Sequence, residues 1–314
     1  MTVSSGRPRG RGRGGFWVLA AATVWGTSGA AAALVPQVSA LVVGALTLAV
    51  SGIVLCAVMF RRIGAVFRAS GAGPLLAVAA GCLGVYILAF FSGMALAGVA
   101  VGTVIAIVSA PIVVGAIEAV TASALPGRRW SVAAALTLAG GVLLVTGRQS
   151  SVGSPVDPGQ LAIGSAVAVL AGIAYAGFTI ATSRLILPSP RRPEGLADGP
   201  VIGAVQGLTV IPLAVVALVV GVPGVTEVAA WSVLLYIGLV PTAVGYLLYA
   251  RGLRHVSAST ASLLTLFEPV VATLLGVFLI GEVLSSVGWV GLGLAMAGLA
   301  AATVTAGAVG VADR

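Results

Sequence analysis

The feature of this sequence that most constrains its fold is the length of its uncharged apolar runs. Residues 14–60 and 69–117 contain no charged side chain. Only 8% of the 314 residues are charged, against about 25% in a soluble domain. A bilayer core about 30 Å thick is crossed by about 20 helical residues. We therefore predict an all-α membrane protein, and shorter uncharged runs support the prediction at 130–147, 158–183, 199–226, 228–250 and 283–312.

The number of crossings follows from the same runs. Each of the two longest can hold two helices and contains a turn-like break, Val35-Pro36-Gln37 in the first and Ser92-Gly93-Met94 in the second. Residues 255–281 form another run that only Glu268 interrupts. The prediction is ten transmembrane helices, near residues 16–35, 38–60, 72–92, 96–121, 130–147, 160–181, 200–220, 229–250, 257–281 and 287–307.

The arginines support this count. All sixteen basic residues are arginine, and ten crossings place every one except Arg148 on the same side. Cytoplasmic loops accumulate Lys and Arg. We therefore expect a multi-pass protein of the cell membrane with both termini in the cytoplasm. The arginines on that side occur at 7–13, 61–68, 128–129, 184–192, 251–254 and 314.

Residue types exclude several function classes. Without lysine the chain forms no Walker A loop, so it is not by itself an ATP-driven pump. Sparse arginines in a chain of mean hydropathy +1.17 do not form a nucleic-acid surface. Cys56 and Cys82 lie in apolar runs without metal-ligand spacing, and the single histidine, His255, does not complete a hydrolase site. We expect no enzyme activity, no cofactor, no metal and no nucleic-acid partner.

A stretch rich in Ser, Gly and Pro divides the predicted helices into two sets of five. Because five is odd, two similar sets would be inverted repeats, as in many secondary transporters. Trp25-Gly26 in the first set corresponds to Tyr175-Ala176 in the second, and Pro111 corresponds to Pro269. The predicted organisation is a disordered cytoplasmic Arg/Gly tail at 1–15, a first repeat at 16–147, an extracellular linker at 148–159, a second repeat at 160–307 and a cytoplasmic tail at 308–314.

The second half contains a succession of motifs, Tyr236-Ile-Gly-Leu-Val-Pro-Thr242-Ala-Val-Gly-Tyr246, Ala258-Ser-Thr-Ala-Ser-Leu-Leu, Glu268-Pro269-Val-Val-Ala-Thr-Leu-Leu-Gly and Gly281-Glu282. With these motifs the chain resembles the EamA-type, ten-helix branch of the drug/metabolite transporter superfamily over nearly its whole length. The first half is a weaker match: it keeps Trp25-Gly26 and Pro111 but has Thr47 where such proteins often carry an arginine. The resemblance implies a transporter of small metabolites, amino acids or drugs, in some members by proton exchange.

Glu268 is the strongest functional candidate. It falls near the middle of a predicted span, and no basic residue lies inside any span to pair with it. A carboxylate there costs about 2.5 kcal/mol or more. We expect Glu268 either to couple protons or to bind a substrate amine. The structural alternative is a protonated carboxyl hydrogen-bonded across helices.

Pro111 and Pro269 lack the N–H that a helix uses, so the carbonyls of Ile107 and Thr265 are expected to be free. Paired breaks at mid-membrane depth indicate a transport site, although a kink that only improves packing gives the same pattern. Aromatic and hydroxyl side chains near these breaks are the candidate substrate-binding residues, and packing is again the alternative. They are Trp25, Thr27 and Ser28 in the first half and Tyr175, Thr179 and Tyr246 in the second.

Two other carboxylates have structural predictions. Glu282 is expected to make helix-end hydrogen bonds, and Glu118 is expected to snorkel or to pair with Arg128 or Arg129.

The leading hypothesis from the sequence is a secondary active transporter. It would export small organic solutes by alternating access, and proton exchange is one way in which the export could be driven. Its partners would be the solute and the lipid bilayer, with protons added if the export is proton-coupled. A non-transporting scaffold or sensor and a passive facilitator are the alternatives. The oligomeric state does not follow from the sequence.

Overall fold

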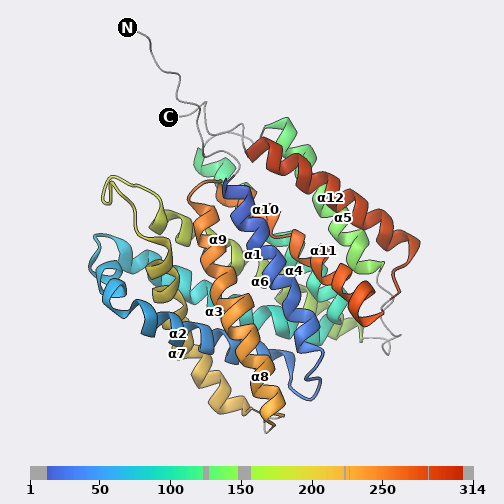
Figure 1. The fold of residues 1–314 in the computed structure, drawn as a ribbon. Coiled ribbons are helices and arrows are strands. Elements are labelled where there is room, and N and C mark those ends of the chain that lie inside the picture. The colour runs from blue at the N-terminus through green and yellow to red at the C-terminus, as the bar shows by residue number, and fades with distance from the viewer. Residues whose placement is uncertain are drawn as a thin grey trace.

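The structure is a computed structural model that describes residues 13–122, 127–147, 157–222, 224–225, 227–281 and 283–306. Within these ranges the regular elements are helices, which form ten rods (Figure 1). Seven rods precede the interrupted ones: α1 (Arg13–Ala32), α2 (Ala40–Arg68), α3 (Ala72–Ala97), α4 (Val99–Ala122), α5 (Arg128–Thr146), α6 (Pro158–Ile186) and α7 (Asp198–Val220).

The eighth and ninth rods are interrupted, and the tenth is a single helix. The eighth runs from α8 (Val228–Ile237) through the π-helix η1 (Gly238–Val244) to α9 (Gly245–Leu253). The ninth consists of α10 (Ala258–Leu264), α11 (Phe267–Leu275) and the π-helix η2 (Gly276–Ile280), and the tenth is α12 (Ser286–Ala306).

The prediction of an all-helical membrane protein is confirmed. Nine helices of the described chain are long and apolar enough to cross a membrane. The remaining rod, α1, has twenty residues that include Trp17, Trp25, Thr27 and Ser28 among its apolar ones. The predicted tail at 1–12 and the residues 148–156 and 307–314 lie outside the described ranges.

One predicted break is wrong. The helix does not end at Ser92-Gly93-Met94, because α3 continues to Ala97 and the turn is made at Gly98, whose φ is +85°. Gly93 serves helix packing instead: a Cβ at this position would lie 3.1 Å from the Cβ of Ala168 on α6. In lipid the backbone must satisfy its own hydrogen bonds, so a Ser-Gly pair inside a span stays helical.

The interruption of the eighth rod follows from Pro241, which has no N–H to give the carbonyl of Ile237. The hydroxyl of Thr242 donates to that carbonyl at 2.9 Å instead. The chain winds as a π-helix around this point and continues into α9 without leaving the rod.

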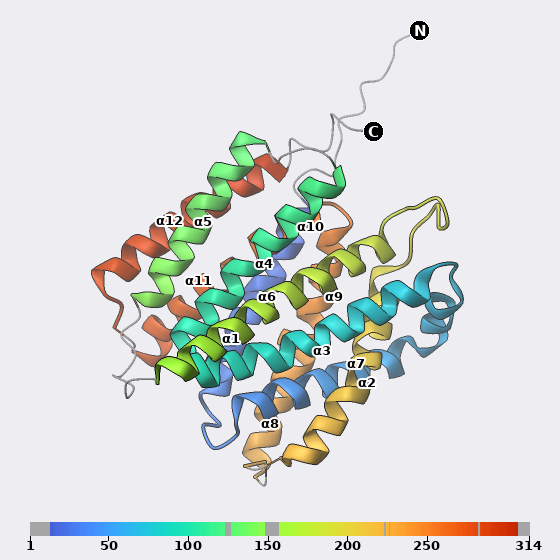
Figure 2. The ribbon, with the colours of Figure 1, turned by 180° about the vertical axis from the view of Figure 1, so that it is seen from behind.

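The rods pack in pairs that are distant in sequence. The most extensive contacts join α3 to α6, α5 to α12 and α2 to α7, and α1 lies against α9 and α11. Figures 1 and 2 show α5 and α12 side by side at one edge of the bundle from both directions. Glycines permit the closeness, since a Cβ at Gly140 would lie 2.2 Å from the backbone N of Ala295. Small residues at an interface let membrane helices approach backbone to backbone.

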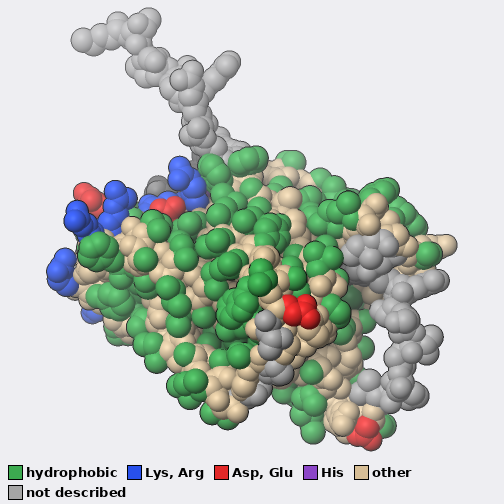
Figure 3. Space-filling model, turned by 60° about the horizontal axis from the view of Figure 1, so that its bottom comes forward, with side chains coloured by type: hydrophobic (Ala, Val, Ile, Leu, Met, Phe, Trp, Pro, Cys, Tyr) green, Lys and Arg blue, Asp and Glu red, His purple; other side chains and the backbone are tan. Residues whose placement is uncertain are grey.

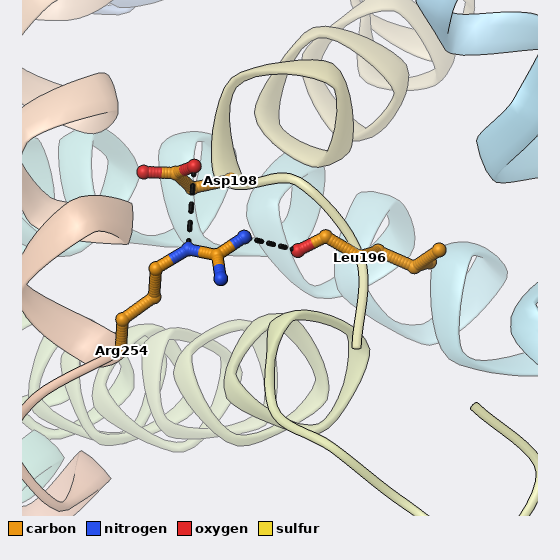
Figure 4. A network of polar contacts seen from close by, with 3 residues as sticks. All are labelled: Leu196, Asp198 and Arg254. Carbon is orange, nitrogen blue, oxygen red and sulfur yellow. Dashed lines mark hydrogen bonds and ion pairs between the residues drawn. The ribbon is translucent and has the colours of Figure 1, made fainter. Parts of the chain in front are cut away.

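The arginine-bearing loops meet at one end of the bundle. Arg192, in the α6–α7 loop, donates to the carbonyl of Ser70, in the α2–α3 loop, at 3.3 Å. Arg254, just after α9, forms an ion pair with Asp198 at 3.3 Å and donates to the carbonyl of Leu196 (Figure 4). In the face drawn in Figure 3, Arg side chains gather at one edge and hydrophobic side chains cover most of the rest. The grouping of these loops agrees with the predicted positions of the arginines.

Candidate functional site

A cavity of about 330 Å³ lies among the helices of the bundle. Its lining residues come from α1, α2, α3, α4, α6 and the two interrupted rods, and none of them comes from the described parts of α5, α7 or α12. Known small-molecule pockets begin at about 300 Å³, and an engineered cavity of about 150 Å³ binds one benzene. The cavity can therefore hold a solute with an aromatic ring and a short side chain.

The cavity lies toward the end of the bundle opposite the arginines. On α2, which ends at Arg68, the lining residues from Val43 to Leu48 are near the start. On α3, which begins after that loop, they run from Tyr86 to Met94, near its end. On the arginine side, Phe178 and Tyr249 follow, both with 0% exposure. The fully buried rings separate the cavity from the arginine-bearing loops.

Glu268 lines the cavity at the break between α10 and α11. It is the second residue of α11, so it lies in the first turn of a nine-residue helix in the interior of the bundle. The N-terminus of a helix favours negative charge. No described side chain or backbone group donates to its carboxyl or forms an ion pair with it. The break therefore places the Glu268 carboxyl at a helix N-terminus, which lowers the cost of a negative charge there, and leaves it open to the cavity.

The free carbonyl predicted beside Pro269 is not present, although the rod is interrupted next to this proline. Pro269 is the third residue of α11, where an N–H would have no helical partner in any case. The carbonyl of Thr265 is not free, because it accepts the N–H of Glu268 at 2.9 Å. On the other half, α4 continues as a helix through Pro111, and its neighbours Ile107 and Ala110 line the cavity.

Aromatic rings form a connected arc around the cavity. The arc begins on α3 and crosses to α6, where the rings of Tyr86 and Tyr175 are 5.1 Å apart. It continues through Tyr249 to α1, where the rings of Trp25 and Tyr246 are 5.1 Å apart. On α3 the arc also includes Phe90, next to Tyr86, and Phe91, next to Phe90. Six residues of the arc line the cavity, namely Trp25, Tyr86, Phe90, Phe91, Tyr175 and Tyr246.

The structure divides the predicted substrate-binding residues into two groups. Trp25, Ser28, Tyr175 and Tyr246 line the cavity, as does Glu268. Two other predicted residues do not.

Thr27 faces away from the cavity and its hydroxyl lies 2.9 Å from that of Tyr236. Thr179 is fully buried, with its hydroxyl 3.0 Å from that of Tyr249. Both hydroxyls therefore have partners within the bundle. Thr179 contributes to the site only by fixing the Tyr249 ring.

Glu118 has a partner different from the predicted arginines. Its two carboxylate oxygens accept the backbone N–H groups of Ala258 and Ser259 at 2.9 and 3.2 Å. These residues begin α10, whose first N–H groups need acceptors from outside the helix. Glu118 therefore ties α4 to the ninth rod at the arginine end. Glu282, predicted to make helix-end hydrogen bonds, lies outside the described residues.

Several lining residues were not predicted. Phe91 lies on a largely apolar helix, where sequence alone does not distinguish a cavity-facing ring from a lipid-facing one. Pro241 and Thr242 also line the cavity. A signal for them exists, because a proline inside an apolar run followed directly by a threonine indicates a local break with its own hydroxyl partner.

Comparisons with known proteins agree with this architecture. Residues 162–304 match the sequence profile of the EamA-like transporter family. The chain is similar to YwfM of Bacillus subtilis (strain 168), described as an uncharacterized transporter, with 37% identity over 286 residues that cover 90% of this chain and 91% of the relative. A solved crystal structure, described only as that of a protein, matches with a TM-score of 0.77 and 22% identity, over 94% of this chain and 98% of the other. At that identity the likeness concerns the fold alone.

Proposed function

The chain belongs to the EamA-like transporter family and is a membrane transporter, and on this premise we propose that it is a secondary active exporter of small organic solutes. The observation that carries the proposal is the cavity of about 330 Å³ with Glu268 open to it at a helix break. Interrupted helices at a site within the membrane are typical of secondary transporters. The substrate site is this cavity, and Trp25, Ser28, Tyr175 and Tyr246 are its predicted contacts.

Alternating access of two inverted repeats is the proposed mechanism. Exchanging each rod with the rod five places along the chain leaves the main helix contacts unchanged. The contact of α3 with α6 becomes that of the eighth rod with α1, and the contact of α4 with α6 becomes that of the ninth rod with α1. The pairs α2–α7 and α5–α12 exchange onto themselves. This pattern supports two related halves at 16–147 and 160–307.

The arginines support a cytoplasmic position for the loops that carry them. In that orientation both termini are cytoplasmic, and the cavity lies toward the outside of the cell membrane. Buried rings and the contact of Glu118 with α10 close the cytoplasmic end. The conformation then corresponds to the outward-facing stage of an export cycle, in which the solute leaves.

Proton coupling is assigned to Glu268, because among the lining residues it is the one carboxylate. The test is uptake of a mixed panel of amines, amino acids and neutral metabolites into everted membrane vesicles with an acidic interior. We expect uptake to fall when a protonophore collapses the gradient and to be lost in Glu268→Gln. The matched control is Glu194→Gln, the same chemical change at an exposed loop residue.

The outcomes separate the alternatives. Uptake that is unchanged by the protonophore and by Glu268→Gln contradicts proton coupling. Equilibration without accumulation against a gradient indicates a passive facilitator. If neither the unmodified protein nor the Glu194→Gln control takes up any solute, the result indicates a scaffold or sensor.

A further inference from the structure

We propose that the cavity selects organic cations, in particular primary amines with an aromatic or apolar body, and that the Glu268 carboxylate is their counter-ion. The inference rests on the proposed function in taking the cavity as the transport site. It concerns the chemical class of the solute, which neither the family nor the relatives specify.

The first argument is the charge of the lining residues. Glu268 is the only ionisable carboxylate among them, and they include no arginine and no histidine. The chain has no lysine, and its arginines in the described ranges lie at the loop end beyond the buried rings. A solute anion entering the cavity would have to leave water without a cationic partner, which is strongly unfavourable in a low-dielectric site. A cation has a partner in Glu268.

The second argument is the direction of the hydroxyl groups. Ser28 donates its proton to the carbonyl of Trp25 at 2.7 Å, and Thr265 donates to that of Ser262 at 2.7 Å. Thr47 and Thr242, which also line the cavity, donate to backbone carbonyls at 3.3 and 2.9 Å.

A hydroxyl has one proton to donate and two lone pairs. All four hydroxyls therefore offer only acceptors to a solute. An ammonium group, with its three donors and no acceptor, is complementary to such a wall. The other polar side chains of the lining, Trp25 and three tyrosines, are neutral donors that do not replace a missing positive charge, and the Trp25 Nε1 and the Tyr175 hydroxyl are buried.

The third argument is the aromatic arc. The negative face of an aromatic ring attracts a cation, and an apolar solute body packs against the same rings. Tyr86, Phe90 and Phe91 are consecutive in this arc, with centroid distances of 5.6 and 5.3 Å. The lining thus combines aromatic rings, which suit an apolar body, with hydroxyl acceptors and a carboxylate, which suit an ammonium group.

The experiment compares three probes with the same phenyl body and different charge. Phenethylamine is a cation near pH 7, phenethyl alcohol is neutral and hydrocinnamate is an anion. Binding to the purified full chain in detergent is measured by equilibrium dialysis. Hydrogen bonds to charged groups exceed neutral ones, so we expect the amine to bind about tenfold more tightly than the alcohol. Hydrocinnamate should bind more weakly than both.

The variants test the counter-ion. In Glu268→Gln, which keeps the shape of the side chain, the preference for the amine should fall below about threefold on the same reasoning. Glu268→Asp keeps the charge and should retain part of the preference, and the control Glu194→Gln should retain all of it. If Glu268→Gln does not fold, the ranking of the three probes on the unmodified chain still decides the matter.

Three results overturn the inference: equal or tighter binding of the alcohol or of hydrocinnamate, an amine preference that persists in Glu268→Gln, or no binding of any probe. Flux of the same probes into proteoliposomes separates this inference from the proposed function. Transport of the alcohol as fast as the amine contradicts the cation selectivity and leaves transport standing. Selective binding of the amine without flux of any probe supports the selectivity and contradicts transport.

Discussion

The contact between α1 and α11 at Gly26 allows a single packing cost to be isolated. A Cβ at Gly26 would lie 2.7 and 2.8 Å from the Cβ and Cγ1 of Val271 and 2.9 Å from the carbonyl oxygen of Glu268. Gly29, one turn along α1, also lines the cavity and would bring its Cβ to no heavy atom within 4 Å. A Gly→Ala substitution at the two positions therefore makes the same chemical change on the same helix, and only the free space around the added methyl group differs.

The magnitude follows from this difference. Replacing a helical glycine by alanine is favourable by about 1 kcal/mol in helix propensity, and this gain applies to both variants and cancels. Overpacking an occupied site costs about 1–3 kcal/mol. We therefore expect Gly26→Ala to be less stable than Gly29→Ala by about 1–3 kcal/mol.

Thermal denaturation of the purified variants in detergent measures the difference. In a chain of this size 1 kcal/mol corresponds to about 2 °C in melting temperature, so the two variants should differ by about 2–6 °C. Gly81→Ala, on the exposed side of α3 with no atom within 4 Å, is the control for the propensity gain. Equal melting temperatures for the two α1 variants, or a higher one for Gly26→Ala, would refute the close approach of α1 to α11.

Three further predictions use the same melting assay. Glu118→Gln keeps one acceptor for two N–H groups at the start of α10, so it should lower stability by about 1–3 kcal/mol, and an unchanged melting temperature would contradict the tie. Ser51→Ala removes the donor to the fully buried Oε1 of Gln206 and should lower stability by about 1–3 kcal/mol. Gln206→Leu should lower stability less, because it also removes a buried amide nitrogen that has no partner. A larger loss for Gln206→Leu than for Ser51→Ala would contradict the pairing of these two residues. Asp198→Asn breaks the partly exposed ion pair with Arg254 but leaves the hydrogen bond from Arg254 to Leu196, so it should change stability by no more than about 1 kcal/mol, and a larger loss would contradict this weak contribution.

The fold could be predicted from the sequence because it depends on two features that can be read directly, the uncharged runs and the positions of the arginines. Uncharged runs of sufficient length must be helices in lipid, and the positions of the arginines fix how many there are. The position of Glu268 in a polar environment could be predicted for a related reason, since a carboxylate without a counter-ion inside such a run is costly in an apolar one. The cavity and the helix break at α10–α11 provide this environment.

The orientation of individual side chains could not be predicted in the same way. In a soluble helix the polar face identifies solvent, but lipid is as apolar as the protein interior. Thr27 and Ser28 are adjacent and both carry a hydroxyl, yet only Ser28 lines the cavity. The partner of Glu118 was likewise beyond the sequence, because the start of α10 is 140 residues away along the chain. Such pairings depend on how the rods pack, which apolar runs do not encode.

The absence of α5, α7 and α12 from the described cavity wall has a consequence for how this protein can diversify. The glycine contacts of α5 with α12 tolerate almost no added volume, so packing constrains the residues where these two helices meet. The residues that line the cavity are distributed over the other rods, with Tyr175 alone from α6 and several from each of the rest. Single substitutions in the cavity lining can then change which solute binds, while the packing of α5 with α12 keeps the helix arrangement. Related proteins would thus share this fold and differ in the solutes that they carry.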